Sequence, residues 1–308
     1  MDISPHNIIQ TNALAFSFGK HKVLSDINLQ VPAGSIFGFL GPNGAGKSTT
    51  IKTLLGLLET EPGMIHIFGK ELNQNKISIL KRIGAMVETP SLYDHLDAHR
   101  NLEITARLRN IPLTRSEPLL DTVSLLHDAL RPVKEYSTGM KQRLSLAITL
   151  LAEPELLILD EPINGLDPSG IMEMRQLLTR INEEKNCTIL LSSHILSEIE
   201  KLCSDAAIIN SGTIAFQGSM KTLLGMATGN EVITIHTNDA LKAYKIMDGR
   251  YDSIIKDHNL VVSVRSKPES AQIIRTLVEN GIEIYSAEKE TTGLEASFLH
   301  LLNENHPS

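Results

Sequence analysis

The sequence predicts an α/β fold with a buried, largely parallel β-sheet, followed by a smaller α+β domain. Short apolar runs typical of buried strands recur through the first two-thirds of the chain, and segments with helical apolar spacing lie between them. One run ends at a glycine-rich loop, and the pattern restarts after residue 220. Because strands alternate with helices, we expect a parallel sheet covered on both faces.

The N-terminal region predicts an antiparallel β-subdomain, then a buried strand and a helix. Residues 7–31 contain short alternating runs with a turn at Gly19-Lys20. Residues 35–40 form an apolar run that ends at the glycine-rich loop, as a buried strand would. After the loop, residues 48–58 are apolar at helical spacing.

Three further apolar runs predict the rest of the sheet. They are Leu156–Leu159, Thr188–Leu191 and Ala206–Ile209, with helices expected at residues 171–184 and 195–203. Residues 91–152 contain no convincing strand, so we expect a helical subdomain inserted into the sheet there.

The C-terminal region has its own pattern after a loose stretch at residues 219–230. We expect strands at 231–236, 260–264 and 282–285, and helices at 240–247, 270–279 and 294–302. The sequence therefore predicts two domains, residues 1–220 and residues 221–308.

Composition argues against several classes of protein. The formal net charge of −7 disfavours nucleic acid as the main partner, because that function usually needs a basic surface. Cys187 and Cys203 form no disulfide framework and fit a reducing compartment. Residues 1–10 lack the pattern of a signal peptide. The longest apolar stretch, Leu144–Ala152, is far shorter than the roughly 20 residues of a membrane-spanning helix.

The glycine-rich loop matches the pattern G-x-x-x-x-G-K-[ST] of a phosphate-binding loop. Its residues are Gly41, Pro42, Asn43, Gly44, Ala45, Gly46, Lys47 and Ser48, followed by Thr49. Glycines allow backbone N–H groups to surround an anion at the positive end of the next helix. Lys47 adds a charge for the phosphates, and the Ser48 hydroxyl can bind Mg²⁺. A glycine-rich turn without a ligand is the weaker interpretation, because the loop joins a buried strand to a helix.

Two carboxylates follow the strand at Leu156–Leu159, where α/β folds bind their ligands. Asp160 is placed to hold Mg²⁺, and Glu161 to polarise an attacking water as a general base. A solvated acidic turn is the alternative, and the phosphate loop upstream makes it the weaker one.

Several further motifs resemble those of the ABC family. The segment Tyr136–Arg143 (YSTGMKQR) resembles the second nucleotide motif, Asn164–Pro168 (NGLDP) resembles the D-loop, and Ser192–His194 (SSH) resembles the switch histidine. With the phosphate loop and the two carboxylates, the motifs agree in order and spacing from about residue 7 to residue 218. The resemblance implies a P-loop NTPase core of ABC type.

The resemblance also implies a role for individual residues. Phe18 takes the place of the aromatic residue that stacks on adenine. Ser137, Thr138, Gly139 and Met140 would contact ATP bound to a second subunit, and Asp167 would cross the dimer interface. His194 would hold the γ-phosphate and position the water.

Three positions depart from the family pattern. Thr138 stands where glycine is commonest, and Ile163 where threonine is usual; we expect both to be tolerated. Glu88 occupies the place of the Q-loop glutamine, where a carboxylate can bind nucleotide-associated Mg²⁺ but cannot donate as an amide does. This variant resembles the bacitracin and lantibiotic self-protection branch, which implies antibiotic resistance.

The function implied by the resemblance is that of a transporter ATPase. It would form a homodimer, or a pseudo-dimer with a related ATPase, around two Mg·ATP. It would power a separate permease at the cytoplasmic face of the membrane and export a peptide antibiotic or hydrophobic compound. A soluble ABC protein acting on ribosomes or DNA is the alternative, but such proteins usually carry two ATPase cores, a long coiled coil or basic extensions. A regulatory module without turnover would lack Glu161 or His194, and both are present.

Overall fold

The computed structural model describes residues 7–87, 92–227, 231–257, 259–264, 267–290, Leu294 and Phe298. The chain divides into two compact units, Met1–Ser219 and Met220–Ser308. Each unit has its own hydrophobic core, so each is described by itself.

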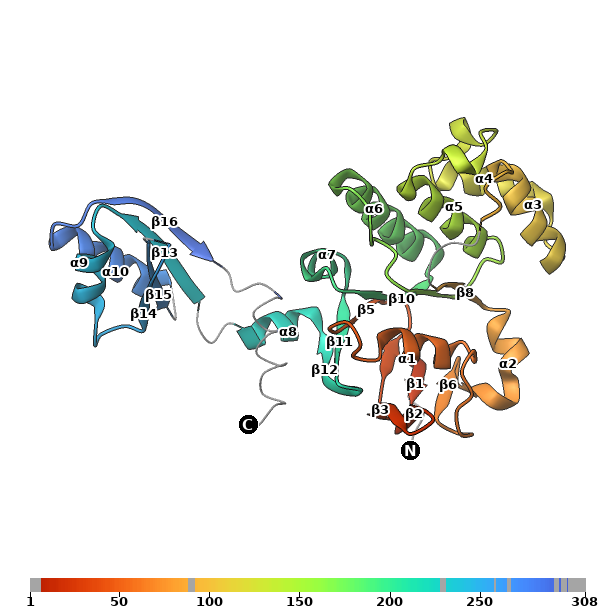
Figure 1. Cartoon of the computed structure of the whole chain (residues 1–308), viewed down its shortest axis with the longest axis horizontal. Coiled ribbons are helices and arrows are strands. Elements are labelled where there is room, and N and C mark those ends of the chain that lie inside the picture. Colours follow the sequence, from red (N-terminus) through yellow and green to blue (C-terminus); the bar gives the residue numbers. More distant parts are fainter. Residues whose placement is uncertain are drawn as a thin grey trace. The chain divides into compact units, whose positions relative to one another are not determined.

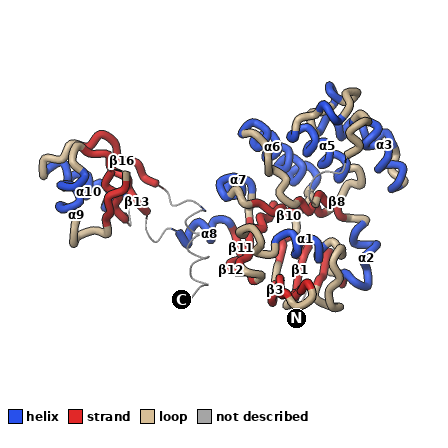
Figure 2. Tube along the Cα trace, in the orientation of Figure 1, coloured by secondary structure: helices blue, strands red, loops and turns tan. Residues whose placement is uncertain are grey.

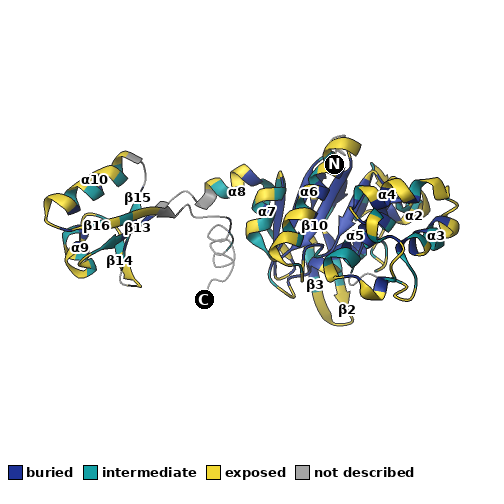
Figure 3. Ribbon diagram, turned by 90° about the horizontal axis from the view of Figure 1, so that it is seen from above, coloured by how far each residue is buried: buried dark blue, intermediate teal, exposed yellow. Residues whose placement is uncertain are grey.

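A six-stranded sheet forms the centre of the first unit, with the strand order β12-β11-β5-β10-β9-β8. All neighbouring pairs are parallel except β11 and β12. Every residue of β5, β9 and β10 is buried, and the strand labelled β10 has the dark blue of buried residues in Figure 3. The bounds are β5 Ile36–Leu40, β8 Ile83–Met86, β9 Leu156–Leu159, β10 Thr188–Ser193, β11 Asp205–Asn210 and β12 Thr213–Ser219. The predicted parallel, buried sheet is confirmed.

Further antiparallel strands lie beside this sheet, as predicted for the N-terminal region. One sheet has the order β4-β1-β6-β7, and a hairpin joins β2 to β3. The bounds are β1 Asn7–Thr11, β2 Leu14–Phe18, β3 His21–Ile27, β4 Gln30–Pro32, β6 Ile65–Ile67 and β7 Lys70–Glu71. Their apolar side chains share one core with the central sheet and with the first helix.

Helices cover both faces of the central sheet (Figure 1). In Figure 1, α6 and α7 lie on one side of the sheet, and α1 lies between the sheet and the N-terminal strands. The bounds are α1 Lys47–Leu54, α2 Leu72–Leu80, α6 Pro168–Lys185 and α7 Leu196–Leu202. The expected helix at residues 48–58 is shorter than predicted, because α1 ends before Gly56, whose φ of 61° does not continue a helix.

Residues 92–152 contain helices and turns but no strand, in agreement with the expected helical insertion. The helices are α3 Ala98–Arg109, α4 Ser116–Thr122 and α5 Thr138–Leu150, and short 3₁₀ turns lie at Leu113–Arg115, Leu126–Asp128 and Val133–Glu135. In Figure 2 these helices gather beside the β8 end of the sheet. None of the helices in the described ranges is both long and apolar enough to span a bilayer.

The second unit contains a four-stranded sheet with the strand order β14-β15-β13-β16, in which all neighbouring pairs are antiparallel. From β13 to β16 the chain order is β-α-β-β-α-β, a split βαβ arrangement. The bounds are β13 Glu231–Thr237, α9 Ala240–Met247, β14 Ser253–Lys256, β15 Asn259–Val264, α10 Lys267–Glu279 and β16 Ile284–Glu290. The predicted α+β class of this region is confirmed. The helix expected at 294–302 lies outside the described residues, apart from Leu294 and Phe298.

The prediction of a loose stretch at residues 219–230 is wrong for its first part, because α8 spans Met220–Ala227. Met220 and Leu223 are buried, so apolar residues at helical spacing outweigh the effect of Gly225. Residues 228–230 lie outside the described part of the chain.

Candidate functional site

The phosphate loop joins β5 to α1 at the edge where the parallel strands end. Gly41 leaves room for the neighbouring strand, because a Cβ atom there would lie 2.4 Å from the carbonyl oxygen of Ile209. Gly46 precedes α1 with a φ of 113°, which favours glycine. The backbone N–H groups at the start of α1 therefore face the loop, as anion binding requires.

Lys47 lies in the loop with its side chain 7% exposed. Its Nζ donates to the carbonyl oxygens of Gly41 and Pro42, at 2.7 and 3.3 Å, and lies 3.9 Å from Oε1 of Glu161. Burial lowers the pKa of Lys47, and the charges of Glu161 and Asp160 oppose that shift. The Lys47 ammonium group thus places a positive charge at the loop, where it could pair with phosphate oxygens.

The two carboxylates directly follow β9. Asp160 is buried, and its Oδ1 accepts a hydrogen bond from Oγ of Ser192 at 2.5 Å. Glu161 has a φ of 51°, which is uncommon for a residue with a long side chain, and its N–H donates to the same Ser192 oxygen at 2.9 Å. This backbone turn directs the Glu161 side chain toward the phosphate loop, where it lies near Lys47.

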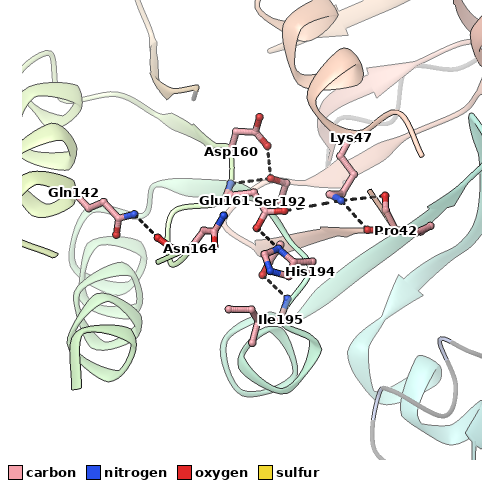
Figure 4. Close-up of polar contacts among 11 residues, drawn as sticks. Pro42, Lys47, Gln142, Asp160, Glu161, Asn164, Ser192, His194 and Ile195 are labelled. Atoms are coloured by element: carbon pink, nitrogen blue, oxygen red, sulfur yellow. Dashed lines mark hydrogen bonds and ion pairs between the residues drawn. The ribbon is translucent and has the colours of Figure 1, made fainter. Parts of the chain in front are cut away.

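His194 follows β10, and its Nδ1 lies 2.8 Å from Oε2 of Glu161. Ser193 fixes the turn, because its hydroxyl accepts the N–H of Ile195 at 3.0 Å. Figure 4 shows the side chains of Lys47, Glu161 and His194 directed toward one another. The structure therefore brings Lys47 together with Glu161 and His194, which follow it by more than 100 residues in the sequence.

These groups line one pocket of about 300 Å³. Its lining residues are Val23, Asn43, Gly44, Gly46, Lys47, Ser48, Thr49, Glu161, Asn164 and His194. Most of the predicted phosphate-loop residues are among them. Asp160 does not line the pocket, but it is linked to Glu161 by hydrogen bonds through the Ser192 hydroxyl. Asn164 belongs to the D-loop-like motif but received no role from the sequence. Val23 lies in the alternating run that predicted an N-terminal strand, which gave no indication of a role at the site.

The predicted second nucleotide motif lines a different pocket, of about 380 Å³. Ser137, Thr138 and Gly139 share it with Asp167, whereas Met140 is not among its lining residues. Ser137 caps α5 by accepting the N–H of Met140 at 3.3 Å, so this motif lies at the start of the helix.

The D-loop-like segment contributes to both pockets, because Asn164 lines the first and Asp167 lines the second. Nε2 of Gln142, on α5, donates to the Asn164 carbonyl oxygen at 2.9 Å (Figure 4). Asp167 caps α6 by accepting the N–H of Gly170 at 2.9 Å. The D-loop-like segment thus connects the pocket that contains Lys47 with the pocket that contains Ser137.

Oxygen ligands for Mg²⁺ are available at the first pocket. Ser48 lines it with a hydroxyl group, and Asp160 supplies a carboxylate close enough to influence Lys47. Within the described ranges, no three His, Cys, Asp or Glu side chains gather as a metal cage. This donor set fits Mg²⁺, which usually takes one or two protein ligands and completes its shell with water and substrate phosphates. Glu88, the third predicted ligand, lies outside the described residues.

Comparison with known proteins identifies the family. The family model described as ABC transporter matches residues 24–164. The bacitracin transport ATP-binding protein BcrA of Bacillus licheniformis is 40% identical over 301 residues, covering 96% of this chain and 97% of BcrA. The chain belongs to the ABC transporter family. It is an ATP-binding subunit of that family and an ATP hydrolase.

Two further ABC proteins show how far the likeness extends. The lantibiotic transport ATP-binding protein SrtF of Streptococcus pyogenes is 41% identical over 210 residues, covering 68% of this chain and 90% of SrtF. The structure of cbiO1 from Clostridium perfringens, part of the transporter complex cbiONQ, has a TM-score of 0.67 at 26% identity. That likeness covers 71% of this chain and 91% of cbiO1. The resemblance inferred from the sequence motifs is confirmed.

Phe18 allows a direct test of base stacking in this ABC ATPase. Its ring, at the end of β2, is 55% exposed and makes an edge contact with Phe16 at 4.9 Å. We expect Phe18→Ala to weaken ATP binding by about 1 to 3 kcal/mol, because a base loses its stacking partner. Stability should change by no more than about 0.5 kcal/mol, because the ring is exposed.

Calorimetric titration with a non-hydrolysable ATP analogue measures the affinity, and thermal unfolding measures the stability. Phe18→Tyr is the matched control, since it keeps the aromatic face. Unchanged affinity in the alanine variant would show that Phe18 does not contact the base.

Proposed function

We propose that this ABC ATPase closes as a dimer around two Mg·ATP and powers a separate membrane permease that exports a peptide antibiotic or hydrophobic compound. The permease would hold the subunit at the cytoplasmic face of the membrane. The dimer is inferred from two sets of residues on one chain that line different pockets, one around Lys47 and one around Ser137. Each set is called a half-site below.

The first half-site supplies the chemistry of hydrolysis. The phosphates would lie in the loop against Lys47 and the N-terminus of α1, which place positive charge beside them. Ser48 and Asp160 would hold Mg²⁺, which neutralises phosphate charge when bound. Glu161 would polarise the attacking water, and His194, 2.8 Å from Glu161, would orient it toward the γ-phosphate.

The second half-site lies in a different pocket from the first. Ser137, Gly139 and Asp167 line their own cavity, and none of them lines the one that contains Lys47. If both sets of residues act on the same ATP, they must come from two subunits. A homodimer, or a pseudo-dimer with a related ATPase, would form two such composite sites by symmetry.

The permease and the cargo are inferred from relatives. BcrA and SrtF are named as ATP-binding proteins of bacitracin and lantibiotic transport, and BcrA aligns along nearly the whole chain. As its place in the Q-loop implies, Glu88 would lie near Mg·ATP. It would transmit the movement caused by ATP binding and hydrolysis to the permease. Its carboxylate in place of the commoner glutamine is the sequence feature that first indicated this branch.

Export is tested by resistance in cells. We expect a strain without this gene to become several-fold more sensitive to bacitracin or a lantibiotic, because the exporter loses its source of energy. Wild-type protein should restore resistance, whereas Glu161→Gln should not, at equal expression. The minimal inhibitory concentration is the measurement. Equal resistance with and without the gene, across both antibiotic classes, would contradict the proposed cargo.

A further inference from the structure

A buried hydroxyl group connects the two catalytic carboxylates. The parallel register pairs Leu191 of β10 with Leu159 of β9, so the next residues, Ser192 and Asp160, lie side by side. Ser192 is fully buried, and its Oγ lies 2.5 Å from Oδ1 of Asp160 and 2.9 Å from the backbone nitrogen of Glu161. Figure 4 shows this side chain between the two acidic residues.

The chemistry of the groups determines the direction of both hydrogen bonds. The Glu161 N–H can only donate, so the Ser192 oxygen accepts that bond. The hydroxyl proton then goes to the carboxylate oxygen of Asp160, which accepts it. One hydroxyl group thereby orients the proposed Mg²⁺ ligand and the backbone that carries the proposed general base.

The contact to Glu161 also supports an unfavourable backbone conformation. A φ of 51° places Glu161 in the left-handed region, which non-glycine residues occupy only when their surroundings hold them there. The Glu161 carbonyl oxygen accepts the N–H of Asn164 at 3.1 Å, which closes the turn on its other side. From this turn the Glu161 carboxylate reaches both Lys47 and His194.

We propose that Ser192 is a positioning residue that holds Asp160 and Glu161 in the relative geometry needed for metal binding and water activation. This inference rests on the roles proposed above for the two carboxylates. Ser192 itself does not line the pocket, so it acts through them.

The test compares Ser192→Ala with a variant that loses a buried hydroxyl elsewhere in the same strand. Thr188 lies at the opposite end of β10, is buried, and accepts the N–H of Gly34 at 2.8 Å. Thr188→Val therefore removes a buried hydroxyl group and one part-buried hydrogen bond, without touching either carboxylate. Ser192→Thr is the rescue variant, because it keeps the hydroxyl group and suits a strand.

Two measurements separate positioning from a purely structural role. We expect Ser192→Ala to lower kcat by about 10- to 100-fold, as is typical when a residue that orients metal ligands is removed. Binding of a non-hydrolysable ATP analogue should need more Mg²⁺ for half-maximal saturation, whereas binding in EDTA should stay at the wild-type level. Ser192→Thr should restore both quantities, and Thr188→Val should match wild type in both.

The proposal is overturned if Ser192→Ala keeps the wild-type kcat and Mg²⁺ dependence, if Thr188→Val shows the same losses, or if Ser192→Thr is as impaired as Ser192→Ala. Should Ser192→Ala fail to fold, Ser192→Cys supplies the comparison, because a thiol is a weak donor and acceptor. Failure of the proposed function has a different result: the wild-type chain itself would show no Mg²⁺-dependent ATP binding.

Discussion

Replacing Lys47 with alanine is expected to reduce ATP hydrolysis by at least about 100-fold, the typical loss when one charge-stabilising donor leaves an active site. The buried ammonium group lies within hydrogen-bonding distance of the loop carbonyls and beside Glu161. Without it, the phosphate charge would meet the Gly41 and Pro42 carbonyl oxygens and the carboxylates without a compensating cation. ATP affinity should fall for the same reason.

Phosphate release by the purified variant measures turnover, and calorimetric titration measures affinity. Lys81→Ala is the matched control, because Lys81 is an exposed lysine of the same unit that lies outside the pocket. We expect its turnover to equal that of wild type. Full turnover by Lys47→Ala would show that the phosphate site lies elsewhere.

Replacing Glu161 with glutamine is expected to stop hydrolysis while ATP binding persists. The amide has nearly the shape of the acid but cannot take a proton from water, so turnover should fall by about 100- to 10,000-fold, the range attributed to general acid–base catalysis. The loop, Lys47 and Ser48 are unchanged, so the nucleotide stays bound. A closed dimer that cannot hydrolyse ATP should then accumulate.

Size-exclusion chromatography with Mg·ATP measures that dimer. We expect a dimer peak in Glu161→Gln and little of it in wild type, because the proposed wild-type dimer would reopen after hydrolysis. Glu61→Gln is the control, because it makes the same chemical change at an exposed position away from both pockets. A monomeric Glu161→Gln variant with bound ATP would contradict the closed-dimer mechanism but leave nucleotide binding intact.

Strands with continuous apolar sequences could be predicted from local pattern alone. Leu156–Leu159 has the same bounds in the structure, because a run that is buried on both faces carries its own signal. β8 was not predicted as a strand, since Gly84 weakens the pattern there. The tertiary structure explains that glycine: a Cβ atom on it would lie 2.8 Å from Leu157 and 2.9 Å from the Thr149 carbonyl oxygen.

Local sequence motifs were enough to predict the chemistry of the proposed site. The phosphate loop and the carboxylates after β9 are local motifs, and local spacing is enough to place each at a strand end. The family was also determined in this way, because several motifs occur in the expected order along the chain.

The way in which these motifs combine in space depends on long-range packing. The parallel register of β9 and β10 brings Ser192 beside Asp160 across 32 positions of sequence, and sequence spacing contains no information on such a register. The separation of the two half-sites likewise depends on the packing of α5 and α6 against the sheet. Long-range contacts, which local patterns do not encode, therefore support the role proposed for Ser192 and place Ser137 and Lys47 in different pockets.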